Sequence, residues 1–255
     1  MKITLLESSV GTGPHQQILA SYLVNDTTVI DAGSIGFLNP LGIQKQIEHV
    51  FLSHSHIDHL ASLPIFIDNV YTPSPVCPVI YGGPETLDCI RKHIFNDVIW
   101  PDMIRLSEEE TPFLKLQEVS PEESIQIGDL TITPVRLNHI VPTFGFILDD
   151  GQDAAAIVSD TSPTDRIWEL INANERIRGI FLESSFPNSF EWLAEKAMHL
   201  TPDLVRLELD KLQHDVPVIA IHIKIAFETT VRAELESLKL PNLQIGEPGR
   251  TYTFQ

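Results

Sequence analysis

The chain has 255 residues, of which 43% are hydrophobic and 20% charged, and its formal net charge is −18 at pH 7. This length suits one hydrophobic core, so we expect a single hydrolase domain over residues 1–255. So acidic a surface repels phosphate polymers and anionic lipid, which argues against long nucleic acid and membranes as partners. No apolar run approaches the roughly 20 residues of a membrane helix, and the start MKITLLESSVGTG lacks the apolar core of a signal peptide, so we expect a cytoplasmic protein.

Short apolar runs separated by glycines fill the first sixty residues and predict strands. These runs are MKITLLES, SYLVND, TTVIDAG and HVFLSHS. Helices are expected over ASLPIFIDNVY and over PETLDCIRKHIFNDVIW, the second beginning at Pro84. The Gly-Thr-Gly run at 11–13 lacks the Lys-Ser/Thr of a phosphate loop and favours a tight turn near the site. The acidic stretch SEEETPFLKLQEVSPEES predicts an irregular, solvated connection.

The second half repeats this pattern of strands and helices. ESIQIGDLTITPVRLNHI predicts a hairpin that turns at Gly128-Asp129. Further strands are expected in AAAIVSDT, GIFLESSF and VPVIAIHIK, with helices in PTDRIWELINANE, around SFEWLAEKAM and in TPDLVRLELDKLQ. The last helix is marked by Thr201 as N-cap and by Pro202 and Asp203 in its first turn. Two strand-rich halves with intervening helices predict two mixed sheets flanked by helices.

Histidines and aspartates gather where the predicted strands end. Neutral imidazole and ionised carboxylate are good ligands for zinc-like cations, and seven such residues suffice for two ions that share one carboxylate. The seven are His54, His56, Asp58, His59, His139, Asp160 and His222. The only cysteines, Cys77 and Cys89, are remote from the cluster and form no Cys-x-x-Cys motif. The predicted metal site is therefore free of thiolates.

The order of these residues resembles the five motifs of the metallo-β-lactamase superfamily along the whole chain. Several stretches look specifically like the class II 3′,5′-cyclic-nucleotide phosphodiesterases, namely HSHIDHLASLPIFIDN, NHIVPTFGFIL, SDTSPTDRIW, ESSFPN, HLTPDLVRLELDKL and IHIK. The resemblance implies an α/β (α+β) fold, the four-layer αββα sandwich of the metallo-β-lactamases. It also implies hydrolysis of cyclic AMP or cyclic GMP, small anionic nucleotides, to 5′-monophosphates. A homodimer is compatible with the resemblance.

The resemblance also assigns roles to the clustered residues. His54, His56 and His139 would hold one divalent ion, most often Zn²⁺, with Mn²⁺ or Fe as substitutes. Asp58, His59 and His222 would hold the second ion, with Asp160 bridging the two.

Three further residues complete the expected site. Asp31 would hydrogen-bond to a metal-bound histidine and orient it. His199 would protonate the leaving group, and Glu183 would orient His199, so that Asp58, Glu183 and His199 are the catalytic candidates. We expect His199 on a loop at a helix start rather than on a buried face.

Three alternatives share parts of this pattern. A tRNA 3′-endonuclease has the same ligands and a Glu…His pair, but it lacks the flanking stretches and needs a basic docking surface. A thioester or β-lactam hydrolase shares the histidine cluster but lacks SDTSPTDRIW and HLTP. A metal-binding or sensor protein without catalysis would not need an acid such as His199.

Overall fold

The computed structural model describes residues 1–8 and 16–254, so the turn expected at 11–13 lies outside the described residues. The chain divides into two compact units. The N-terminal unit comprises Lys2–Val119 and Pro248–Tyr252, and the C-terminal unit comprises Met1, Ser120–Glu247 and the end of the chain from Thr253. That the whole chain acts as a single domain stays a prediction.

Seven strands form the sheet of the N-terminal unit in the order β14-β1-β2-β3-β4-β5-β6. The strands β1 to β3 pair antiparallel, whereas β3 to β6 pair parallel. Their bounds are Lys2–Leu5 (β1), Tyr22–Val24 (β2), Thr28–Ile30 (β3), His49–Phe51 (β4), Val79–Gly82 (β5), Lys115–Glu118 (β6) and Thr251–Thr253 (β14). The sheet is therefore mixed, as the sequence predicts.

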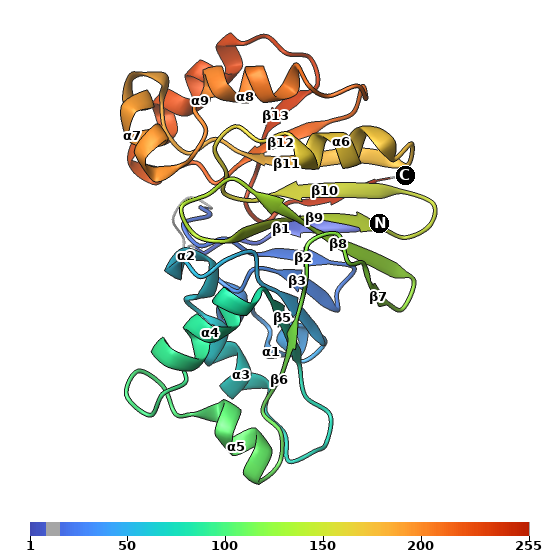
Figure 1. Ribbon diagram of the computed structural model, residues 1–255, viewed down its shortest axis with the longest axis vertical. Helices are drawn as coiled ribbons and strands as arrows, with labels where there is room; N and C mark the ends of the chain where they lie inside the picture. The colour runs from blue at the N-terminus through green and yellow to red at the C-terminus, as the bar shows by residue number, and fades with distance from the viewer. Residues whose placement is uncertain (9–15, 255) are drawn as a thin grey trace. The chain divides into compact units, whose positions relative to one another are not determined.

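Helices α3 and α4 pack onto this sheet (Figure 1). Phe66 of α3 and Ile90 of α4 share one buried cluster with Val50 of β4 and Ile80 of β5. The helices of the unit are Ile35–Phe37 (η1, a 3₁₀ turn), Leu41–Gln44 (α1), Ile57–Leu60 (α2), Leu63–Val70 (α3), Pro84–His93 (α4) and Met103–Glu109 (α5). Burial of these apolar side chains from both layers is the main stabilising contribution of this unit.

The C-terminal unit has a second seven-stranded sheet in the order β13-β12-β11-β10-β9-β8-β7. The strands β7 to β10 pair antiparallel, and β10 to β13 pair parallel. Their bounds are Ile125–Ile127 (β7), Leu130–Leu137 (β8), Thr143–Asp149 (β9), Ala154–Val158 (β10), Ile177–Glu183 (β11), Val218–Ile221 (β12) and Leu243–Ile245 (β13). The hairpin predicted around Gly128 is confirmed.

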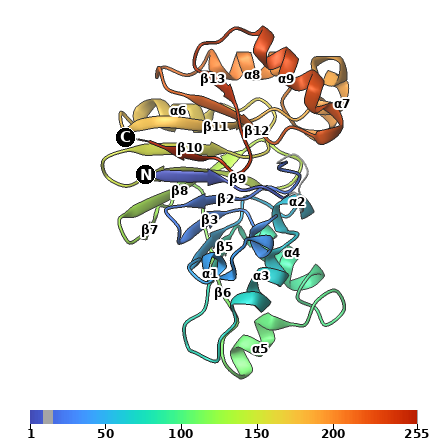
Figure 2. The same cartoon turned by 180° about the vertical axis from the view of Figure 1, so that it is seen from behind.

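Helices α6, α8 and α9 lie on the same side of strands β10–β13 (Figures 1 and 2). Ala156 of β10 packs in one core with Trp168 of α6, Val205 of α8 and Val231 of α9. The helices are Arg166–Ala173 (α6), Asn188–Phe190 (η2), Glu191–Ala197 (α7), Pro202–Leu209 (α8), Ile225–Phe227 (η3) and Glu228–Ser237 (α9). The Thr201 hydroxyl accepts a hydrogen bond from the Leu204 N–H, which confirms the predicted cap of α8.

Two local expectations are wrong. The acidic stretch expected to be irregular contains β6 and the end of α5. β6 is an edge strand with mostly exposed side chains. Its sequence therefore lacks the alternation of apolar and polar residues that predicts a strand, although its backbone pairs with β5. The helix that begins at Pro84 ends at His93. The residues after it form a turn, in which Asp97 adopts a left-handed conformation (φ 59°) and the Asn96 side chain accepts from two following backbone N–H groups.

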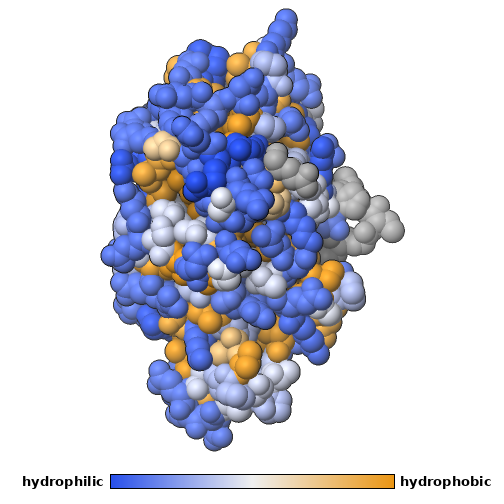
Figure 3. Space-filling view, turned by 90° about the vertical axis from the view of Figure 1, so that its right-hand side faces the viewer, coloured by the Kyte–Doolittle hydropathy of each residue, from blue (hydrophilic) through white to orange (hydrophobic). Residues whose placement is uncertain are grey.

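On the face drawn in Figure 3, hydrophilic residues predominate and hydrophobic residues form smaller areas between them. No helix among residues 1–8 and 16–254 has the length and apolar character needed to cross a membrane.

Candidate metal centre

In the N-terminal unit the parallel strands β3 and β4 bring Asp31 and Ser53 to the same edge of the sheet. Two backbone contacts fix α2 beside it: the Ala20 N–H donates to the Asp58 carbonyl (2.8 Å), and the Ala32 N–H donates to the His59 carbonyl (2.7 Å). A Cβ atom on Gly33 would collide with that Asp58 carbonyl oxygen, so the close approach requires glycine here. The helix that carries Asp58 and His59 is therefore held by backbone contacts.

The Asp31 carboxylate is fully buried and holds two histidines. Its Oδ2 atom accepts directly from His59 Nδ1 (2.7 Å) and from the Ser53 hydroxyl (2.8 Å). The same hydroxyl lies 2.9 Å from His54 Nδ1 and accepts from it, while the Ser53 N–H donates to Asp31 Oδ1 (2.7 Å). Asp31 thus orients His59 directly and His54 through Ser53.

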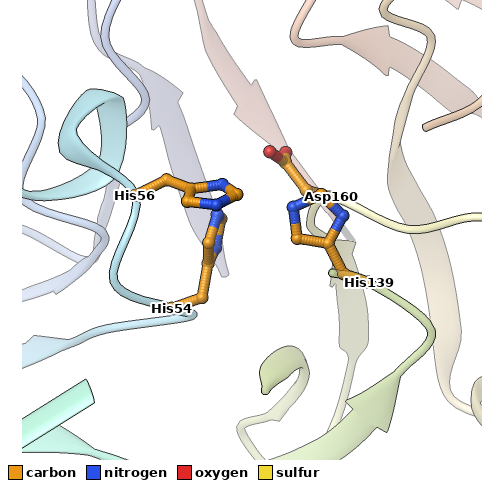
Figure 4. A group of neighbouring side chains, drawn as sticks. All are labelled: His54, His56, His139 and Asp160. Carbon is orange, nitrogen blue, oxygen red and sulfur yellow. The ribbon is translucent and has the colours of Figure 1, made fainter. Parts of the chain in front are cut away.

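The rings of His54, His56 and His59 stand close together. The ring centroid of His54 lies 4.6 Å from that of His56 and 4.2 Å from that of His59. His54 lies on the segment after β4, and His56 is the residue directly before α2 (Figure 4). Asp58 follows in the first turn of the same helix. The structure therefore brings the residues of the HSHIDH motif together at one end of the sheet.

In the C-terminal unit the strand ends carry the other candidates. Because β10, β11 and β12 are parallel, Asp160, Glu183 and His222 lie at the same edge, and β8 delivers His139 there because it runs in the same direction as β10. One ligand atom from each of Asp160, His199 and His222 lies within 4.8 Å of the other two. Figure 4 also draws His139 and Asp160, which follow β8 and β10.

Glu183 is a fully buried carboxylate of this group, and it holds His199. Its Oε1 atom accepts from His199 Nδ1 (2.7 Å) and from the Thr161 N–H (3.0 Å). Burial lowers the pKa of His199, but the charge of Glu183 and its hydrogen bond outweigh burial, so that the pKa lies above its usual value. His199 is therefore biased toward the protonated form that a general acid needs.

The expectation that His199 avoids a buried face is wrong, although it does lie on the loop between α7 and α8. His199 is only 5% exposed. Met198 ends α7 in a left-handed conformation (φ 55°), and the chain then turns the His199 ring against Phe186, with 5.6 Å between the ring centroids. The sequence lacked a signal for this turn because methionine seldom adopts positive φ.

His139 is held from the same turn. Its Nδ1 atom donates to the Met198 carbonyl (2.9 Å). Burial lowers the pKa of His139, and the Met198 hydrogen bond offsets this only in part. His139 is thus kept neutral, which is the form that binds metal.

These contacts fit a divalent metal. Metal-ligating histidines typically pass one ring N–H to a carboxylate or carbonyl, which leaves the other nitrogen as the ligand atom. His59 and His139 do this directly, and His54 and His222 do it through serine hydroxyls. Imidazole and carboxylate donors without thiolate suit zinc, manganese or iron.

Sequence reasoning missed the two serines. Ser185 Oγ donates to Glu183 Oε2 (2.8 Å) and lies 3.0 Å from His222 Nδ1, as Ser53 lies between Asp31 and His54. A serine next to the HSHIDH motif and a serine two residues after Glu183 were the available signals, but serine is too common at strand ends to stand out.

The sequence is similar to those of known cyclic-nucleotide phosphodiesterases. The sequence model of the class-II cAMP phosphodiesterases matches residues 37–148. A probable 3′,5′-cyclic-nucleotide phosphodiesterase of Yersinia pestis is 26% identical over 229 residues, which are 80% of this chain and 64% of that protein. The chain therefore spans less than two thirds of that relative's length.

Solved structures agree on the fold. The crystal structure of unliganded yeast PDE1 superimposes with a TM-score of 0.80 at 18% identity over 98% of both chains. The metallo-β-lactamase fold protein YhfI of Bacillus subtilis gives 0.74 at 18% identity, again over 98% of both chains. The chain thus has the α/β metallo-β-lactamase fold, with a sequence similar to those of the class-II cAMP phosphodiesterases.

Proposed function

We propose that the protein is a metal-dependent phosphodiesterase that hydrolyses 3′,5′-cyclic nucleotides, cyclic AMP or cyclic GMP, to 5′-monophosphates. The Glu183–His199 pair beside Asp160 carries the proposal, because a buried histidine that a carboxylate holds next to a candidate ligand supplies an acid that a binding protein would not need. The sequence similarity to cyclic-nucleotide phosphodiesterases supports the substrate class.

The proposed cofactor is a pair of divalent ions, most often Zn²⁺. By the order of the motifs, one ion would be held by His54, His56 and His139. The other would be held by Asp58, His59 and His222, and Asp160 would bridge the two. When bound, such ions supply Lewis acidity, which acidifies water and stabilises negative charge on phosphoryl oxygens. Asp58 and Asp160 would offset only part of the charge of two divalent ions, so the site would attract one phosphodiester anion despite the acidic surface.

His199 would donate the proton that the reaction needs. The departing ribose 3′-oxygen is a poor leaving group, and an alkoxide of this kind leaves readily only when it is protonated. Glu183 accepts from His199 Nδ1, so the proton to be delivered sits on Nε2, which faces the Asp160 carboxylate at 4.0 Å. Asp58 completes the proposed catalytic set as a ligand.

The acidic composition favours a small anionic nucleotide over long nucleic acid or a membrane, and a cytoplasmic location belongs to the same proposal. A homodimer stays a prediction.

The proposal is tested by turnover of cyclic AMP, cyclic GMP, a tRNA precursor and a thioester by the metal-loaded protein. We expect 5′-monophosphate from the cyclic nucleotides, loss of product after chelation and recovery after metal is restored. Cleavage of the tRNA precursor or the thioester with inert cyclic nucleotides would refute it.

A further inference from the structure

A cavity opens beside His199 within the C-terminal unit. Its volume is about 660 Å³, inside the range of about 300–1,000 Å³ that small-molecule pockets occupy. It lies between α7, the first turn of α8 and the loop that follows Asp160, and His199 forms part of its wall. A ligand in this cavity would therefore contact the proposed acid.

An exposed tryptophan lines the cavity. Trp192 on α7 is 63% exposed, whereas Trp168 of the same unit is 1% exposed in the core. Met198, Leu204 and Pro163 supply further apolar surface to the same cavity. A large exposed indole beside apolar walls forms a platform on which a flat aromatic ligand can stack.

Two carboxylates also line the cavity. Glu191 and Glu195 are four residues apart on α7, so their side chains lie on one face of the helix. Carboxylates accept hydrogen bonds from N–H groups and repel a second phosphate. The cavity therefore suits a neutral, flat ring that carries N–H donors, and both purine bases meet this description.

We infer that this cavity binds the purine base of the nucleotide, stacked on Trp192 with its N–H groups toward Glu191 and Glu195. The inference rests on the proposed function and deepens it. In a 3′,5′-cyclic nucleotide the ribose separates the phosphodiester from the base. His199 lines this cavity, and its Nε2 atom lies 4.0 Å from an Asp160 carboxylate oxygen. A sugar whose 3′-oxygen reaches His199 would direct its base into the cavity.

The test compares kcat/KM for a cyclic purine nucleotide with kcat/KM for methyl riboside 3′,5′-cyclic phosphate, which has the same phosphodiester and leaving group but no base. Stacking of one base on an aromatic side chain predicts about a fivefold to 100-fold preference for the nucleotide. Trp192→Ala should remove most of this preference, mainly through a higher KM for the nucleotide. Trp192→Phe, which keeps an aromatic ring, should retain most of it.

Leu207→Ala is the matched control, because Leu207 is 47% exposed on the neighbouring α8 and lies outside the cavity lining. It should match the unaltered protein on both substrates. Equal kcat/KM values for the two substrates in the unaltered protein, or an equal loss on both in Trp192→Ala, would overturn the inference while the proposed function stands. If the metal-loaded protein hydrolyses neither substrate, the proposed function falls and the inference falls with it.

Discussion

Ser185 Oγ lies 2.8 Å from Glu183 Oε2 and 3.0 Å from His222 Nδ1, so one hydroxyl joins a buried carboxylate to a candidate metal ligand. Ser53 makes the same link between Asp31 and His54 in the N-terminal unit. In each unit a buried carboxylate therefore holds one histidine directly and a second one through a serine. Such outer contacts fix the ring orientation and raise the basicity of a ligand.

Ser185→Ala should weaken metal binding without unfolding the protein. The His222 ring loses its link to Glu183, and loss of an outer contact of this kind costs about 10- to 100-fold in metal affinity. Chelator competition at equilibrium measures the change. Ser184→Ala is the control, because the hydroxyl of this neighbouring buried serine has no hydrogen-bond partner among the described residues. Equal affinities for the two variants would show that the link does not position a ligand.

The purified protein should hold close to two divalent ions per chain. The expectation follows from seven ordered imidazole and carboxylate residues, with Asp160 counted as shared. Elemental analysis after mild dialysis measures the stoichiometry. His59→Ala should lower it toward one, whereas His93→Ala, which changes a histidine outside the proposed site, should leave it at two. Full activity with one ion or none would exclude the dinuclear arrangement.

His199→Ala should slow turnover of a cyclic nucleotide by about 10²–10⁴-fold, the usual contribution of general acid catalysis. The loss should shrink for a nitrophenyl phosphodiester, because nitrophenolate departs without a proton. Parallel kcat measurements on both substrates, with metal content determined alongside, separate the two effects. Equal losses on both would remove His199 from the acid role. Glu183→Gln should reduce turnover less than His199→Ala does. The reduction should again be smaller for the nitrophenyl substrate, since Glu183 acts through His199.

Glu208 should matter for stability rather than for chemistry. It is 1% exposed and accepts from Trp168 Nε1 (2.7 Å), the Thr164 N–H (3.2 Å) and Lys211 Nζ (2.7 Å), which ties α8 to α6 and to the loop after Asp160. Glu208→Ala leaves buried donors unsatisfied and should lower the free energy of unfolding by about 3–5 kcal/mol. Urea denaturation measures it. Glu234→Ala on α9 is the comparison, because this carboxylate accepts from one backbone group, the Asn188 N–H. An equal decrease in the free energy of unfolding in the two variants would contradict the role of Glu208 in joining α8 to α6.

Much of the site could be predicted because the sequence shows where the strands end. Asp31, Asp160 and Glu183 each close a short apolar run, and the parallel pairing of the strands then brings such ends to one edge. The turn at Met198 and the serine links could not be predicted, because they depend on one unusual φ value and on hydroxyl contacts between distant elements. The strand β6 was not predicted because its side chains are mostly exposed, so its sequence does not alternate between apolar and polar residues.

Substrate choice should follow from charge. A tRNA precursor brings many phosphates against a surface of net charge −18, whereas a cyclic mononucleotide brings one negative charge. Salt screens charges beyond about 8–10 Å at physiological ionic strength, so the distant acidic residues cost the small substrate little. The kcat/KM for a cyclic nucleotide should therefore change less than about twofold between 50 and 200 mM salt, because the binding of one anion releases few counterions. Hydrolysis measured across this range, with a tRNA precursor as competitor, provides the check. Strong inhibition by the tRNA that fades steeply with salt would mean that a basic docking surface exists, and it would favour the endonuclease alternative.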